Sequence, residues 1–205
     1  MVNQYFLEEE RLQWRGAEDN LKSGISGALT EATFRRAQAG DAEAITDLYN
    51  HYKPAIYRYL YHRSSSIQEA EELTTEVFIR VIENLPRYKG NGIPFQAWLF
   101  RVARNLVIDH YRRLNARQEL EIHENIVGST DDPEVLVERI LDAERLREAL
   151  KRLTPDQSDV IILRFLSGMP ISEVAQVLNK SLGAVKMLQS RALESLYQML
   201  KQEEV

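Results

Sequence analysis

Apolar residues recur every three or four positions along most of this chain, which is the spacing of helices that bury one face. The clearest run lies near the C-terminus, where Leu182, Val185, Leu188, Ala192 and Leu196 repeat at this interval. The same spacing appears in stretches 41–63, 66–85, 95–114 and 133–153, and residues 160–166 are apolar nearly all round, as in a central buried helix. The pattern predicts an all-α protein.

Residues at the expected helix ends support these assignments. Asp41 can cap a helix that runs towards residue 63, and Pro54 predicts a kink or two consecutive helices within it. Ser66 and Glu69 form a Ser-x-x-Glu capping box. The segment 154–157, Thr-Pro-Asp-Gln, provides a second capping box with proline in the first turn.

Residues 171–193 read as two short helices joined by a tight turn. Ser172 can cap the first helix and Ser181 the second. With one face of the second helix buried, its outward residues are Gly183, Lys186, Met187, Ser190 and Arg191. This is the helix-turn-helix plan for reading the major groove, although a plain helical hairpin gives the same pattern.

Two further helices carry polar stripes beside their apolar ones. On the helix at 66–85 the stripe is acidic, with one arginine: Glu69, Glu72, Glu76, Arg80 and Glu83. Like charges at this spacing repel each other, so a basic partner surface would account for them, and a solvated face is the simpler alternative.

On the helix at 95–114 the stripe combines an aromatic ring, an amide and charged groups: Trp98, Arg101, Asn105, Asp109 and Arg112. Aromatic rings stack on unpaired bases and arginines hold phosphates, so this composition suits single-stranded DNA. Trp98 as an ordinary core residue is the alternative.

Charge is segregated along the 205 residues, whose net charge is −5. Stretch 87–117 has seven basic residues and one acid, a local charge of +6, whereas 118–150 has three arginines and ten acids, a local charge of −7. This predicts a polyanion-binding domain followed by an acidic linker. We therefore expect an N-terminal extension (1–30, flexible or partly a short docking helix), a helical domain (31–114), a linker (115–133) and a second helical domain (134–205).

Several classes of function lack their sequence signals. The chain has no cysteine, no Walker motif and no nucleophile motif, and its four histidines (His51, His62, His110, His123) are scattered. We expect no catalytic residue, cofactor or metal site. No apolar run is long enough to span a membrane, and acids at 8–10 oppose a signal peptide, which favours the cytoplasm.

Residues 70–113, AEELTTEVFIRVIENLPRYKGNGIPFQAWLFRVARNLVIDHYRR, resemble region 2 of bacterial extracytoplasmic-function (ECF) sigma factors. Residues 153–193, LTPDQSDVIILRFLSGMPISEVAQVLNKSLGAVKMLQSRAL, resemble their region 4. The likeness covers about residues 31–200 in the family's order. It implies a specificity subunit that joins core RNA polymerase, recognises the −10 and −35 promoter elements and helps to open the duplex.

The resemblance also implies roles for individual residues. Core polymerase would bind, through the clamp helices of its largest subunit, at Glu72, Leu73, Thr75, Glu76 and Phe78. The −10 element would be held and melted by Tyr88, Lys89, Asn91, Trp98, Arg101, Asn105, Asp109, Arg112 and Arg113. The −35 element would be read by Ser181, Ala184, Lys186, Met187, Ser190 and Arg191. The flap of the second largest subunit and an anti-sigma factor would be further partners.

Two departures from the family pattern stand out. Thr75 occupies a position that is glutamine in many members, and Met187–Leu188 replaces a Ser-Arg pair, which removes one phosphate contact. A transcription regulator that binds duplex DNA without entering polymerase remains the alternative function, and an enzyme is a more distant one.

Overall fold

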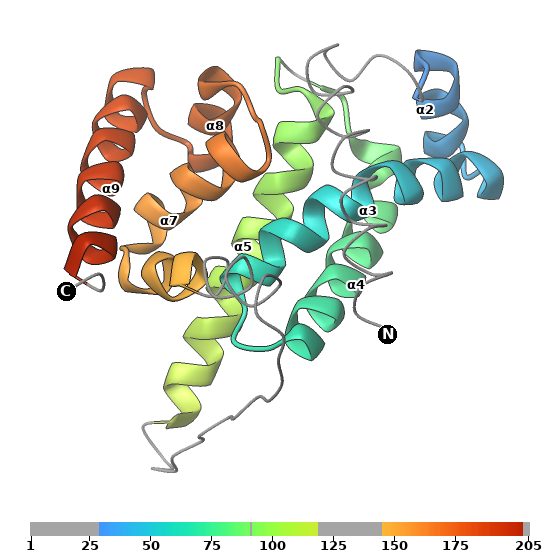
Figure 1. Cartoon of the computed structure of the whole chain (residues 1–205). Helices are drawn as coiled ribbons and strands as arrows, with labels where there is room; N and C mark the ends of the chain where they lie inside the picture. The colour runs from blue at the N-terminus through green and yellow to red at the C-terminus, as the bar shows by residue number, and fades with distance from the viewer. Residues whose placement is uncertain (1–28, 91, 119–144, 203–205) are drawn as a thin grey trace, which may run out of the picture. The chain divides into compact units, whose positions relative to one another are not determined.

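The computed structural model of the chain describes residues 29–90, 92–118 and 145–202, and none of these residues lies in a β-strand. The all-α prediction is confirmed. The helices (Figure 1) are α2 (Glu31–Gln38), α3 (Ala42–Arg63), α4 (Ile67–Asn84), α5 (Phe95–Gln118), α7 (Pro155–Ile161), α8 (Ile171–Leu178) and α9 (Leu182–Gln202). A 3-10 turn (Leu85–Arg87) follows α4, a π-helical stretch (Ile162–Leu166) follows α7, and residues 145–152 are also helical.

Some predictions fall outside the described residues. They concern most of the N-terminal extension, the linker beyond residue 118, the start of the helix predicted from residue 133, and Asn91. The described part of the chain forms two compact units, 29–55 with 78–89, and 56–77 with 90, 92–118 and 145–202. These units divide α3 and α4, and the predicted boundaries at 31–114 and 134–205 stay a prediction.

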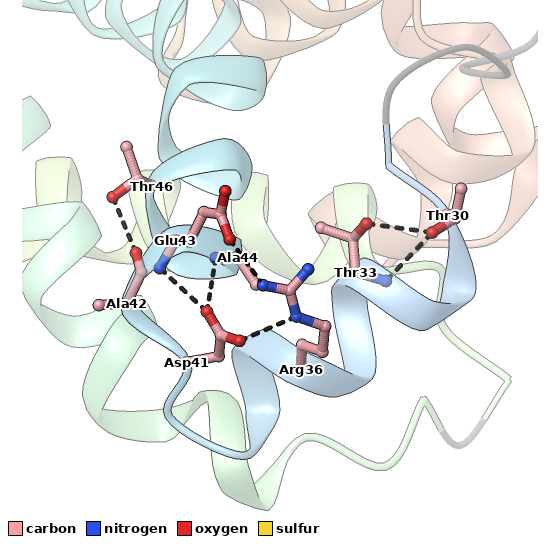
Figure 2. Close-up of polar contacts among 8 residues, drawn as sticks. All are labelled: Thr30, Thr33, Arg36, Asp41, Ala42, Glu43, Ala44 and Thr46. Carbon is pink, nitrogen blue, oxygen red and sulfur yellow. Dashed lines mark hydrogen bonds and ion pairs between the residues drawn. The ribbon is translucent and has the colours of Figure 1, made fainter.

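In the first unit, hydrogen bonds join α2 to the start of α3 (Figure 2). Asp41 caps α3 as predicted, because its Oδ1 accepts from the backbone N–H groups of Glu43 (3.0 Å) and Ala44 (3.2 Å). The Arg36 guanidinium at the end of α2 donates to Asp41 (2.8 Å) and Glu43 (2.9 Å). Gly40 makes the turn between the helices with φ +89°, a conformation that favours glycine.

Apolar side chains from α2, α3 and the end of α4 form the core of this unit. The buried residues are Ala37, Ala44, Leu48, Tyr52, Phe78, Val81 and Leu85. The Tyr49 and Phe78 rings meet edge to face at 4.7 Å between centroids. The Gln38 side-chain amide donates to the carbonyl oxygens of Leu85 (3.1 Å) and Tyr88 (2.8 Å), so it fixes the chain where α4 ends.

Two predictions, one about the interior of α3 and one about the start of α4, differ from the structure in detail. Helix α3 runs unbroken through Pro54, so of the two expected alternatives the pair of consecutive helices is wrong and the kink stays a prediction. Tyr52 and Ile56 are buried on either side of Pro54, and their burial offsets the lost backbone hydrogen bond. At α4, Ser66 caps the helix by accepting from the Glu69 N–H (3.1 Å), but the Glu69 carboxylate accepts from Ser65 instead of completing the box.

The second unit is built around the segment from α7 to residue 166. Thr154 and Gln157 form the predicted capping box at α7. Val160, Ile161, Ile162 and Leu163 are buried, together with Leu99, Phe100, Ala103 and Leu106 of α5. The expectation of burial all round this segment is wrong at Phe165, which is 50% exposed, because only the first residues of the π-helical stretch, Ile162 and Leu163, are buried.

Candidate nucleic-acid interface

Helices α8 and α9 form the predicted helix-turn-helix. Val174, Ala175, Val177 and Leu178 of α8 are buried, and so are Val185, Ala192 and Leu196 of α9. The turn between them is made by Asn179, whose φ of 53° is the left-handed conformation that asparagine tolerates.

The caps of these two helices differ. Ser181 caps α9 as predicted, since its Oγ accepts from the Ala184 N–H at 3.2 Å. Ser172 does not cap α8: the N-cap is Pro170, and the helix has already begun at Ile171. Leu182 was expected on the buried side but is 44% exposed. It lies in the first turn of α9, ahead of the buried stripe that begins at Val185.

The six residues predicted to read the −35 element lie on the outward side of α9 or at its start. Five of them are exposed and one, Ala184, is half-buried: Ser181, Ala184, Lys186, Met187, Ser190 and Arg191. Met187 is 53% exposed, which is unusual for so apolar a side chain. A Cβ added to Gly183 would meet no atom within 4 Å, so the first turn of α9 is open to a close approach by another molecule.

On α5 the structure separates the predicted −10 residues. Asn105, Arg112 and Arg113 are exposed, and Asp109 is half-buried in an ion pair with Arg112 (3.1 Å). Trp98 is half-buried, with its ring 5.5 Å from that of Phe95. This partial burial does not decide between the two interpretations of Trp98, and its role at the −10 element stays a prediction.

Arg101 faces another part of the chain. Its guanidinium donates to the backbone carbonyl of Gln176 on α8, and its Nε is buried without a hydrogen bond. The Gln176 side chain in turn donates to the carbonyl of Gly92 (3.4 Å). Arg101 is therefore half-buried and occupied by this contact, whereas Asn105 is exposed.

The remaining predicted −10 residues, Tyr88 and Lys89, belong to the first unit. The Tyr88 ring meets that of Phe34 edge to face at 5.7 Å, and its partial burial raises the pKa of the phenol. Lys89 is exposed. Sequence reasoning missed the contact between Tyr88 and α2, because no local sequence pattern predicts it.

The acidic stripe of α4 is only partly a surface. Glu72 and Thr75 are exposed and Glu76 is half-exposed, whereas Leu73 and Phe78 are 2% and 3% exposed and pack in the core beneath. Two apolar residues that the sequence reasoning overlooked, Ile79 (52% exposed) and Ile82 (38%), lie on the accessible side of the same helix. The sequence could have indicated their exposure, because Ile79 and Ile82 lie outside the apolar stripe that α4 buries.

Glu69 departs from this stripe because it is held by α5. Its carboxylate contacts His110 Nε2 (2.6 Å) and accepts from the Tyr111 hydroxyl (3.2 Å). Burial alone would raise the pKa of Glu69, but the hydrogen bonds from Ser65, His110 and Tyr111 lower it below its ordinary value. Burial, with the nearby Glu69 charge, raises the pKa of Tyr111 to about 12.

An ionic cluster that no sequence pattern predicted lies in the second unit. Asp159 of α7 is fully buried, and its carboxylate contacts Arg104 (2.8 Å), Arg63 (3.3 Å) and the Tyr59 hydroxyl (2.9 Å). Burial lowers the pKa of Arg104, but Asp159 outweighs it and the net pKa is raised. The available signal was one acid inside the apolar run SDVIIL.

Among the described residues, no group of three or more histidine or acidic side chains is placed to hold a metal ion. Within the same ranges, no helix is both long enough and apolar enough to cross a membrane.

Comparison with known proteins matches both halves of the chain. Residues 48–117 match the Sigma-70 region 2 family and residues 149–198 the Sigma-70 region 4 family. The chain is 39% identical over 167 residues to the ECF RNA polymerase sigma factor BldN of Streptomyces coelicolor, covering 80% of this chain and 63% of that protein. It is 33% identical over 181 residues to the ECF RNA polymerase sigma factor ShbA of Streptomyces griseus, covering 83% of this chain and 95% of that one.

A solved structure of CnrH in complex with the cytosolic domain of CnrY has a similar fold, with a TM-score of 0.66 at 22% identity, over 83% of this chain and 96% of that one. With both regions present in the family's order and a relative matched over nearly its whole length, the chain belongs to the ECF sigma factors, alternative sigma factors that direct RNA polymerase to promoters.

Proposed function

We propose that the exposed side of α4 binds core RNA polymerase, that α5 with the loop before it holds the −10 element, and that α9 reads the −35 element. The observation that carries this assignment is the exposure of three polar surfaces on three helices of the two matched regions. Each surface has the chemistry that its role requires.

On α4 the proposed contact combines charge with apolar area. Glu72 and Glu76 supply the acids, and exposed Ile79 and Ile82 supply apolar surface at the same helical spacing. Buried Leu73 and Phe78 then serve the site indirectly, by holding the backbone of α4 in place. An apolar centre with a charged rim is the usual composition of a protein–protein interface.

The double variant Glu72→Lys, Glu76→Lys tests this surface. Reversing two charges is expected to abolish co-purification with core polymerase, because like charges across an interface cost several kcal/mol. Glu31→Lys, at an exposed acid of α2, is the matched control and should bind core as the unaltered chain does. Undiminished core binding by the double variant would overturn the assignment of α4.

On α9 the phosphate grip would come from Lys186 and Arg191. Each cation that neutralises a phosphate releases about one counterion, so its loss lowers the slope of log K against log salt by about 1. With core polymerase bound, Lys186→Ala and Arg191→Ala should each reduce the slope for promoter duplex. Lys151→Ala, which removes a cation paired with Glu148 elsewhere, should leave it unchanged.

On α5 the exposed amide of Asn105 and the cations Arg112 and Arg113 would engage the −10 element. Their contacts are expected to stabilise the melted state, so Asn105→Ala should reduce permanganate reactivity of −10 thymines without reducing core binding. Gln198→Ala, at an exposed amide of α9, is the control. If the thymines are as reactive with Asn105→Ala as with Gln198→Ala, Asn105 does not contact the −10 element.

This proposal carries three further statements. The chain acts without catalytic residues of its own, since its relatives are sigma factors and polymerase supplies the chemistry. It works in the cytoplasm, where that enzyme meets DNA. An anti-sigma factor is its proposed regulator, by analogy with the sigma factor RpoE of Bartonella quintana, which is solved in complex with the anti-sigma factor NepR.

A further inference from the structure

An apolar side chain lies at the centre of the outward face of α9. Met187 is 53% exposed, whereas Val185 and Ala192 of the same helix are buried. At a helical rotation of about 100° per residue, Lys186 lies about 100° to one side of Met187 and Arg191 about 40° to the other. These two cations are the residues proposed to hold phosphates, so Met187 lies between them, at the place that a base edge would approach.

The turn of α9 that precedes Met187 is open. Gly183 lies one turn earlier on the same face, and a Cβ added there would meet no atom within 4 Å. Side chains of a helix lean towards its N-terminus, so the methionine side chain extends over this vacant position. A recognition helix places its N-terminal residues against base edges in the major groove. Met187 therefore belongs to the part of α9 that would approach the bases.

The same face becomes acidic further along the helix. Glu194, two turns after Met187, is exposed and accepts from the Gln198 side-chain amide (2.9 Å). Phosphates repel a carboxylate, so this part of α9 is expected to lie outside the groove. In the first half of the helix, Leu182 is also exposed and apolar, but it lies about 140° round the helix from Met187. Met187 therefore supplies the apolar surface that faces the groove.

The chemistry of methionine limits the base that it can recognise. In the major groove guanine, adenine and cytosine offer hydrogen-bond donors and acceptors, whereas thymine adds an apolar C5 methyl group. A thioether donates no hydrogen bond and is a weak acceptor, so covering a polar base edge with it leaves groups of the base unpaired. Its flexible, polarisable chain packs well on a methyl group. Met187 therefore favours thymine, whereas the serine of the family pattern could pair with any polar edge.

We propose that Met187 is a specificity-determining residue that packs on the C5 methyl group of a thymine in the −35 element, so that the chain selects this base at that position. Lys186 and Arg191 hold phosphates on either side and do not distinguish bases. The inference rests on the proposed function, in which α9 reads the −35 element, and it names the feature of the base that this helix recognises.

Replacement of thymine by deoxyuracil tests this contact, because the two bases differ only in the methyl group. Each thymine of the −35 element, on either strand, is replaced in turn in a promoter that the complex with core polymerase transcribes. At one position the unaltered chain in this complex should bind the uracil promoter about fourfold more weakly, the factor expected from burial of one methyl group. With Met187→Ala the thymine and uracil promoters should bind equally at that position.

Two further variants separate loss of this contact from a general change in α9. Met187→Leu keeps an apolar side chain and should retain most of the difference between thymine and uracil. Leu193→Ala removes a side chain that is 43% exposed elsewhere on the same helix, and it should retain all of the difference. Because the ratio of the two promoters compares each variant with itself, a uniform loss of affinity does not change the result.

The outcomes distinguish this inference from the proposed function. If no thymine of the −35 element shows the difference, or if Met187→Ala keeps it, Met187 does not read a methyl group and the inference is overturned. The proposed function fails by a separate result, which is an unchanged salt slope for promoter duplex with both Lys186→Ala and Arg191→Ala. Normal effects of these two variants without a methyl effect would leave α9 at the −35 element and refute the role of Met187 alone.

Discussion

Burial separates two phenylalanines that look equivalent in the sequence. Phe100 is fully buried against Tyr59, with ring centroids 5.7 Å apart, whereas Phe165 is 50% exposed. We expect Phe100→Ala to lower the free energy of unfolding by about 3–5 kcal/mol and Phe165→Ala to change it by less than about 1 kcal/mol. Urea unfolding of the two variants measures the difference, and equal losses would contradict the assigned core.

A half-buried histidine, His62, makes stability depend on pH. Burial, with Arg147 and Arg58 nearby, lowers the pKa of His62 to about 4. The unfolded chain, with a histidine pKa of about 6.5, binds this proton more readily than the folded chain. The contribution of neutral His62 to the free energy of unfolding is therefore fully present above about pH 6.5. It is lost as the pH falls from about 6.5 towards about 4.

Proton NMR of the imidazole measures this directly. The His62 resonance, identified by its loss in His62→Gln, should titrate well below pH 6. The variant should also lose part of the decline in stability between pH 6.5 and pH 5. A His62 pKa near 6.5 would refute the half-buried position beside Arg147 and Arg58.

At the scale of helices, the two capping predictions provide a matched test. Thr154 accepts from the Gln157 N–H and closes a complete capping box, while Ser172 lies inside α8, after the N-cap. Thr154→Ala is expected to cost about 1 kcal/mol of stability, and Ser172→Ala less than about 0.5 kcal/mol. Thermal unfolding compares them, and a larger loss for Ser172→Ala would contradict the helix start at Ile171.

Apolar spacing predicted most of the described helices but not α2, because helices bury one side regardless of what covers it and a helix of only eight residues gives a short pattern. Helix ends were harder to predict. At α8, Pro170 and Ser172 both suit a helix start, and only the backbone conformation decides between them. At α4, Glu69 had two competing sets of partners, and the neighbouring helix α5 provided His110 and Tyr111.

For the molecule as a whole, net charge limits what the free chain can do. A chain of net charge −5 has little nonspecific attraction for DNA. We expect the free chain to bind promoter duplex at least about tenfold more weakly at 0.15 M salt than its complex with core polymerase does. Fluorescence anisotropy with core alone as the control measures this, and tight binding by the free chain would refute it.

The sequence by itself determined most of the described helices, though not α2, and it also determined the two matched regions and the outward residues of α9, because periodic spacing and short motifs are local properties of the chain. Only the tertiary structure decided which of the predicted site residues remain accessible and which polar groups pair. Leu73 and Phe78 proved buried, Arg101 contacts Gln176, and Asp159 acquired three partners from distant helices. Such pairings depend on which helix packs against which, and an isolated helix pattern contains no information about its neighbour.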